Sequence, residues 1–176
     1  MSVTISLPDE MFEDIKKHLF PKDDRREQGG FLFSQFDEER QAFVVMEWMP
    51  LKASDYAFQE RGYLELSDAS RVHLIKKAHD MQVSLVEIHC HPGQVKVAFS
   101  LADWVGFRDF VPHIKWRLAK KPYAALVFGH DCVDGFAWVD DQKLPIAVKG
   151  INTETAFHST TGISINVMKR GFYEKI

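Results

Sequence analysis

Two histidines and an aspartate in the middle of the chain have the residue types and the spacing of a metal site. His89 and His91 are separated by one residue and are followed directly by Pro92. Residues two apart on a β-strand point to the same face, so the two imidazoles can lie side by side, and Pro92 then ends the strand where a site would open. Catalytic zinc typically has three protein ligands and an open fourth position for water. Asp103, on the helix predicted next, is the candidate third ligand.

Ser100 and Asp103 also have a purely structural interpretation. A Ser followed three residues later by an acidic residue resembles a capping box, which satisfies free backbone N–H groups at the start of a helix, although that motif prefers Glu or Gln. The two interpretations are compatible, because a capped helix would fix the turn that carries Asp103 and leave a carboxylate oxygen for the metal. A pair of histidines two residues apart occurs by chance in many chains, so the pair alone does not establish a metal site.

A hydrolytic metal site also needs a base, and Glu27 is the candidate. The base takes a proton from water and returns it to the leaving amine, and zinc alone lowers the pKa of its water only to about 7. Glu27 stands just before Gly29 and Gly30 at the start of a predicted strand, and glycines allow close backbone approach in a crowded site. The alternative is that Glu27 only ends the solvated charged run 22–27.

Other reactive residue types form weaker patterns. Cys90 could be a nucleophile with a neighbouring histidine as base, but adjacent residues on a strand face opposite ways. A second zinc site is not indicated, because the remaining histidines have no ligand spacing among themselves: His18, His73, His79, His113, His130 and His158. Three apolar residues on one helical face predict core packing rather than a substrate platform: Trp104, Phe107 and Val111.

The periodicity of apolar residues predicts the elements that position these side chains. Helices are expected over about 9–20, 67–81 and 100–110, and strands over 3–7, 29–36, 42–51, 83–91, 123–130, 132–139 and 144–148. Short turns indicate two hairpins, one formed by the second and third strands and one by the fifth and sixth. The stretch 52–62 has no clean period, which indicates a lid or an insertion.

Three helices among strands, with hairpins where the turns are short, predict an α/β fold of the mixed α+β kind, with a mixed sheet flanked by helices. The length of 176 residues, with 45% apolar and 27% charged residues, fits one globular domain. We expect this domain to span 1–149. We expect residues 150–176 to be a C-terminal extension that is part of the domain or packed on it.

Charge and composition restrict the partners and the location. The net charge is -3 and the basic residues are scattered, so nucleic acid is not an expected partner. No segment approaches the ~20 apolar residues of a membrane-spanning helix, and the first residues do not resemble an export signal. The two cysteines are expected to stay reduced. We therefore expect a cytoplasmic protein without membrane association.

Three motifs, in this order along the chain, resemble those of the JAMM (MPN+) zinc metalloproteases: Glu27-x-x-Gly30, His89-x-His91-Pro92 and Ser100-x-x-Asp103. The resemblance implies a JAB/MPN-like fold, related to that of cytidine deaminases, in which helices flank a curved mixed sheet. It implies one zinc ion bound by His89, His91 and Asp103. It also implies that Glu27 is the general acid/base and that Ser100 hydrogen-bonds the oxyanion of the tetrahedral intermediate.

In this family such sites cut isopeptide or peptide bonds after the C-terminal glycine of ubiquitin or a ubiquitin-like protein. The resemblance therefore implies deconjugation or precursor processing of a ubiquitin-like protein, with activating and conjugating enzymes in the same pathway. One alternative is a non-catalytic MPN-type scaffold, which would be expected to lack metal ligands or the acidic residue. Another is a small-molecule amide hydrolase or deaminase, but the chain lacks the H-x-E and C-x-x-C pattern of zinc deaminases.

The chain departs from the family pattern at two places. Cys90 stands where the family usually has Ser or Thr, but position 90 faces away from both histidines and should accept a small buried residue. The loop 92–99 is one residue longer than is common, so it decides whether Asp103 reaches the metal. Glu87 is typical of the bacterial branch, and its simpler interpretation is a hydrogen bond to a ligand histidine from behind.

Overall fold

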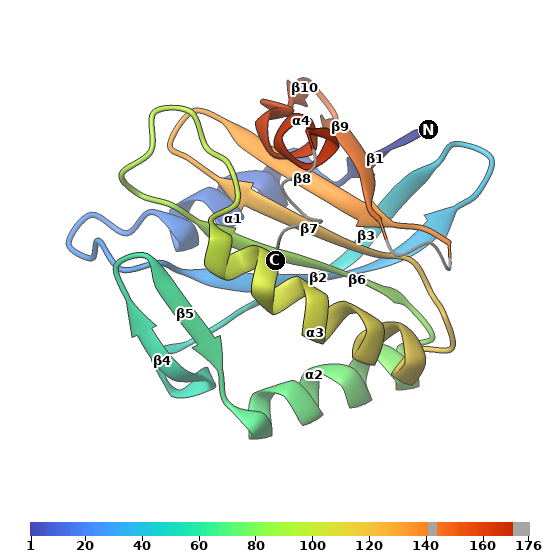
Figure 1. Cartoon of the computed structure of the whole chain (residues 1–176), viewed down its shortest axis with the longest axis horizontal. Helices are drawn as coiled ribbons and strands as arrows, with labels where there is room; N and C mark the ends of the chain where they lie inside the picture. Colours follow the sequence, from blue (N-terminus) through green and yellow to red (C-terminus); the bar gives the residue numbers. More distant parts are fainter. Residues whose placement is uncertain (141–143, 171–176) are drawn as a thin grey trace.

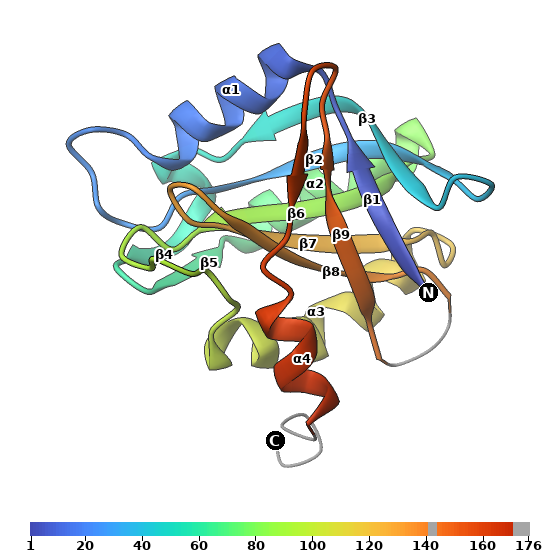
Figure 2. The ribbon, with the colours of Figure 1, turned by 90° about the horizontal axis from the view of Figure 1, so that it is seen from above.

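The computed structural model describes residues 1–140 and 144–170, in which seven strands close into a mixed β-barrel (Figures 1 and 2). Around the barrel the order is β1, β3, β2, β6, β7, β8 and β9, and β9 pairs back with β1. The strands are β1 (Ser2–Ser6), β2 (Gly29–Asp37), β3 (Ala42–Pro50), β6 (Ser84–Cys90), β7 (Tyr123–Phe128), β8 (Val133–Trp138) and β9 (Ile146–Asn152). A short strand, β10 (Phe157–Ser159), pairs with β9.

The closed barrel corrects the expected fold. A JAB/MPN-like curved sheet flanked by helices is wrong for this chain, because β1 is parallel to both β3 and β9 and leaves no free edge between them. Val3 is paired with Val148, and Thr4 with Ala42. Strand twist can bring the two ends of a sheet together, but the pattern of one strand does not reveal which distant strand it joins. The closing pair joins β1 to β9, which lies far along the chain, and β9 continues past residue 148, where the strand predicted from sequence ends.

Successive strand residues alternate between two apolar clusters, one on each face of the barrel wall. Val86, Ile88 and Cys90 of β6 belong to the inner cluster, to which every barrel strand and helix α1 (Asp9–Leu19) contribute. Leu85 belongs to the outer cluster, which α2 (Asp68–Met81), α3 (Leu101–Arg117) and α4 (Ile163–Lys169) help to form. The odd-numbered residues of β6 therefore face these helices.

The predicted helices and hairpins are confirmed, with differences at their ends. β2 pairs with β3, and β7 with β8, in antiparallel register. α3 continues to Arg117, beyond the expected end near residue 110, although Pro112 lies inside it. Proline removes only one backbone hydrogen bond, and the buried side chains of Val111 and Ile114 on either side hold the helix against the barrel. Helix α4 was not predicted, because its seven residues give too short a pattern.

The stretch without clean periodicity forms a small hairpin outside the barrel. It consists of a 3-10 turn (Ala53–Asp55), β4 (Tyr56–Glu60) and β5 (Tyr63–Leu66). The backbone N–H of Glu27 donates to the carbonyl of Glu60, so this hairpin is joined to the segment that leads into β2. Within the described residues, no helix has the length and apolar character needed to cross a membrane.

Candidate metal centre

Strand β6 presents the two histidines. His89 lies on the outer face of the barrel wall, and His91 follows the end of the strand. Cys90, between them, is buried on the inner face, and its thiol donates to the carbonyl of Leu19. The expectation that position 90 faces away from the histidines is confirmed. Because His91 also donates its backbone N–H to Phe128 of β7, the chain direction is held beyond the strand end.

The start of α3 brings the third group to the histidines. Ser100 is the N-cap: its hydroxyl accepts from the backbone N–H of Asp103, and its own backbone N–H donates to Asp103 Oδ2 at 2.6 Å. The predicted capping box is therefore confirmed. The hydroxyl of Ser100 also donates to the same carboxylate oxygen at 2.8 Å. This double contact fixes the carboxylate toward the end of β6, so the longer loop 92–99 does not keep Asp103 away from the histidines.

The potential ligand atoms of His89, His91 and Asp103 lie close together. The Nε2 atoms of His89 and His91 are 3.3 Å apart. Asp103 Oδ1 lies 3.4 Å from His89 Nε2, and Asp103 Oδ2 lies 3.4 Å from His91 Nε2. In a tetrahedral zinc site with bonds of about 2.0 to 2.1 Å, neighbouring ligand atoms lie about 3.3 Å apart. The three residues thus form a group that could hold a metal ion, and the separation of each measured pair of atoms is close to that value.

The outward nitrogens of both imidazoles have polar neighbours. His91 Nδ1 is 3.1 Å from the carbonyl of Ala98, so it carries the proton and leaves Nε2 free for a metal. His89 Nδ1 faces Glu87 at 4.0 Å, and Glu87 accepts a hydrogen bond of 2.5 Å from the hydroxyl of Tyr123. A hydrogen-bonded partner such as the Ala98 carbonyl orients an imidazole in a metal site. The expected hydrogen bond between Glu87 and a histidine is not formed, because 4.0 Å is too long for one. Ala98 and Tyr123 had not been singled out from the sequence, because neither belongs to a local motif.

Glu27 lies beside the three potential ligand residues. Its Oε1 atom is 3.5 Å from His91 Nε2, and only 4% of the residue is exposed. Burial raises the pKa of Glu27, and the two histidines oppose that rise. The carbonyl of Glu27 accepts from the side-chain amide of Gln59, so the β4–β5 hairpin holds its backbone. The alternative that Glu27 is only the solvated end of a charged run is therefore wrong.

Tyr56 and Gly29 support the approach of Glu27. The backbone N–H of Gly29 donates to the Tyr56 hydroxyl at 2.9 Å, and a Cβ atom at Gly29 would lie 2.9 Å from the carbonyl of Ile88. The close approach expected of the glycines is therefore present here. Tyr56 had no sequence signal, because it lies in the stretch without periodicity.

The charges of the cluster stabilise one another. Burial by itself lowers the pKa of His89, but the carboxylates of Asp103, Glu87 and Glu27 raise it to about 9. Burial likewise raises the pKa of Asp103, but the two histidines outweigh it and hold that pKa far below its usual value. Without metal the cluster is therefore a buried ion pair of His89 and Asp103, in which a proton occupies the place a cation would take.

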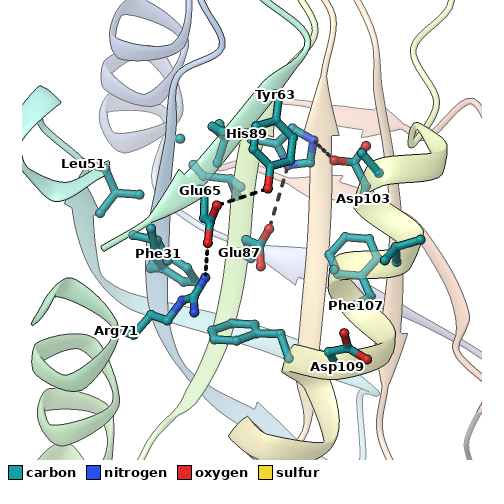
Figure 3. A pocket seen from close by; sticks show the side chains of 18 of the residues that line it. Phe31, Leu51, Tyr63, Glu65, Arg71, Glu87, His89, Asp103, Phe107 and Asp109 are labelled. Carbon is teal, nitrogen blue, oxygen red and sulfur yellow. Dashed lines mark hydrogen bonds and ion pairs between the residues drawn. The ribbon is translucent and has the colours of Figure 1, made fainter. Parts of the chain in front are cut away.

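A groove of about 1060 Å³ leads to this cluster (Figure 3). α2 and β5 border it on one side and α3 on the other, and β2 and β6 form its floor. Figure 3 shows Phe31, Leu51 and Phe107 along the groove, with His89 and Asp103 together at one end. Most of the lining is apolar, so the groove could accept apolar groups of a ligand beside His89 and Asp103.

Comparisons with known proteins show a fold but no family. No protein-family model matches the chain, and no curated protein matches it. The chain is similar to the solution structure of protein DSY2949 from Desulfitobacterium hafniense, with a TM-score of 0.57 and 15% sequence identity. The match covers 91% of this chain and 97% of that chain. At this identity the similarity extends to the fold alone.

Proposed function

We propose that the chain is a zinc-dependent peptidase or isopeptidase that cleaves after the C-terminal glycine of a ubiquitin-like protein. His89, His91 and Asp103 are its metal ligands and Glu27 its general acid/base. The proposal depends on the site and on the order of its motifs, which resemble those of JAMM metalloproteases; it does not depend on the overall fold. One observation carries it: residues from three separate motifs meet in one place, with His89, His91 and Asp103 grouped as potential ligands and Glu27 beside His91.

The geometry supports hydrolysis rather than a purely structural metal site. Three protein ligands leave a fourth tetrahedral position open, whereas structural zinc sites usually have four protein ligands. When bound here, zinc would lower the pKa of a water molecule and polarise the carbonyl of the scissile bond. Glu27, 3.5 Å from His91 Nε2, would take the proton and return it to the leaving amine. Burial raises the pKa of Glu27, which is the direction that favours holding a proton between its uptake and its release.

Ser100 has a narrower role in this proposal. Its hydroxyl proton is donated to Asp103 Oδ2, so it would have to turn from that oxygen to stabilise an oxyanion. The groove supports a peptide substrate, because it borders His89 and Asp103 and extends well past them along α3. A tail that ends in glycine could pass the cluster without a side chain that collides with the imidazoles.

Glu27→Gln tests the chemistry with little change in size. The variant should retain zinc and lose cleavage of a fusion in which a reporter follows the terminal glycine of a ubiquitin-like protein. Glu60→Gln is a matched control, since Glu60 contributes its backbone carbonyl to Glu27 and not its carboxylate. Full activity of Glu27→Gln would remove Glu27 from the mechanism.

The same assay separates the alternatives. Zinc-loaded wild-type protein that cleaves small amides but no fusion or conjugate would point to a small-molecule hydrolase. Zinc binding without either activity would point to a non-catalytic scaffold. Activating and conjugating enzymes of the same modifier should be functional partners if conjugates are the substrates.

A further inference from the structure

The loop between the histidines and α3 is hydrogen-bonded to residues 161–164, at the start of α4. The hydroxyl of Thr161 donates to the carbonyl of Val97 at 3.0 Å. The backbone N–H of Phe99 donates to the hydroxyl of Ser164 at 2.9 Å. Val97 is fully buried and Ser164 is 2% exposed, so water cannot readily replace these bonds.

The residue between these two attachment points touches the metal site. The carbonyl of Ala98 accepts from His91 Nδ1, and Ser100, which follows Phe99, caps α3 and binds the Asp103 carboxylate. A shift of Phe99 would therefore move both the partner of one ligand and the helix start that carries another. Two of the three ligands depend on the same short backbone segment.

The segment 161–164, which holds the loop, is itself bonded to the barrel. Asp134 of β8 is 1% exposed, and its carboxylate accepts from the backbone N–H groups of Gly162 and Ser164. The backbone N–H of Thr161 donates to the carbonyl of Val133. The segment 161–164 is thus fixed to β8 before it contacts the loop.

The loop has further hydrogen bonds, at Val97 and Ala98, that do not involve its last residue, Phe99. The Cys132 thiol accepts from Val97 N–H at 3.3 Å, and the side chain of Gln94 accepts from Ala98 N–H. Ser164 is the side chain that receives the N–H of Phe99, next to Ser100. Loss of the Ser164 hydroxyl should therefore displace Phe99 and, with it, the neighbouring N-cap residue Ser100.

We propose that Ser164 is a positioning residue of the metal centre: through Phe99 it fixes the Ala98 carbonyl behind His91 and the Ser100–Asp103 turn. This inference depends on the metal site in the proposed function but not on the identity of the substrate. Residues that orient metal ligands from behind typically change metal affinity by ten- to a hundredfold. Residues 161–164 are thereby part of the site.

The test is Ser164→Ala, with Ile165→Ala as its matched control on the same helix. Ile165 is 7% exposed in the outer apolar cluster and has no polar side-chain atom to bond the loop. Both variants should lower stability, but only Ser164→Ala should weaken zinc binding, by about tenfold or more in competition with a coloured chelator. Thr161→Val, which removes the bond to Val97, should weaken it as well. Unchanged affinity in both loop variants, or an equal loss in Ile165→Ala, would overturn the inference.

A second readout does not depend on zinc. Nitrogen-15 NMR of the histidine side chains should show the Nδ1-protonated state of His91 in wild type, and a mixture of states in Ser164→Ala. If wild-type protein binds no zinc but this change is seen, the proposed function is wrong, and the inference that Ser164 positions the loop is supported. If zinc binds through His89 and His91 while neither readout changes in Ser164→Ala, the inference about Ser164 is wrong, and the proposed function is unaffected.

Discussion

The Nε2 atoms of His89 and His91 face each other at 3.3 Å inside a buried site. Two imidazole nitrogens at this distance share at most one proton, and the second nitrogen has nothing further to donate to it. A cation between them and the Asp103 carboxylate would satisfy all three groups at once. The relationship between these two residues is thus the central feature of the site.

Zinc content should follow these two side chains. We expect about one zinc per chain in wild-type protein, consistent with a single three-ligand site, and loss of nearly all of it in the His89→Ala, His91→Ala double variant. Metal analysis after dialysis measures this directly. His79→Ala, at an exposed histidine on α2, is the control and should retain the metal. Unchanged zinc in the double variant would remove the proposed site.

Zinc binding should be coupled to proton release. The pKa of His89 without metal is about 9, so at pH 7 the imidazole is protonated and must lose its proton to bind zinc. About one proton should therefore be released from His89 at pH 7, and apparent affinity should rise by up to about tenfold per pH unit until the pH passes 9. Titration calorimetry in buffers with different ionisation enthalpies measures the release. The same observed heat in every buffer would contradict a raised pKa at His89.

Cys90 should be chemically inert in the folded protein. Burial raises the pKa of its thiol to about 12, so the group stays protonated at pH 8, where a thiol reagent is used. We expect one reactive thiol per native chain, from the partly exposed Cys132, and two after unfolding in urea. Cys132→Ser should leave no thiol that reacts in the native state. Retention of cleavage by Cys90→Ser would exclude a thiol mechanism, and its loss without loss of zinc would support one.

Gly30→Ala should destabilise the fold. A Cβ atom at Gly30 would collide with the ring of Trp48 and lie 2.7 Å from the carbonyl of Met49, and the backbone of β3 cannot easily yield. Overpacking of this kind costs about 1–3 kcal/mol in the free energy of unfolding. Gly106→Ala on α3 is the control, since no atom lies within 4 Å of its new Cβ, and it should stabilise the helix by about 0.5–1 kcal/mol. Urea denaturation compares the two, and equal stability of both variants would contradict the close packing at Gly30.

The local parts of the site could be predicted because their signals are short in sequence. The period of two in β6 places His89 and Cys90 on opposite faces whatever surrounds the strand. The spacing of Ser100 and Asp103 forms a capping box through backbone geometry alone. Such features depend on neighbours within a few residues, so the residue types are sufficient to indicate them.

The contacts that complete the site could not be predicted in the same way. Glu27 meets His91 because β2 and β6 pair side by side, with Gly29 opposite His89. Tyr123 meets Glu87 because β7 is the next strand of the wall. Neither pairing is encoded in the periodicity of one strand, since many strands have the same alternation.

The chemical groups of the candidate centre, the strand that alternates them and the capped helix that carries Asp103 follow from residue type and local backbone geometry. The folded structure determined that β1 and β9 close the sheet into a barrel. It also decided that Thr161 and Ser164 brace the loop before Ser100. These are choices among distant partners, and the burial and hydrogen bonding that favour one partner over another exist only once the whole chain has folded.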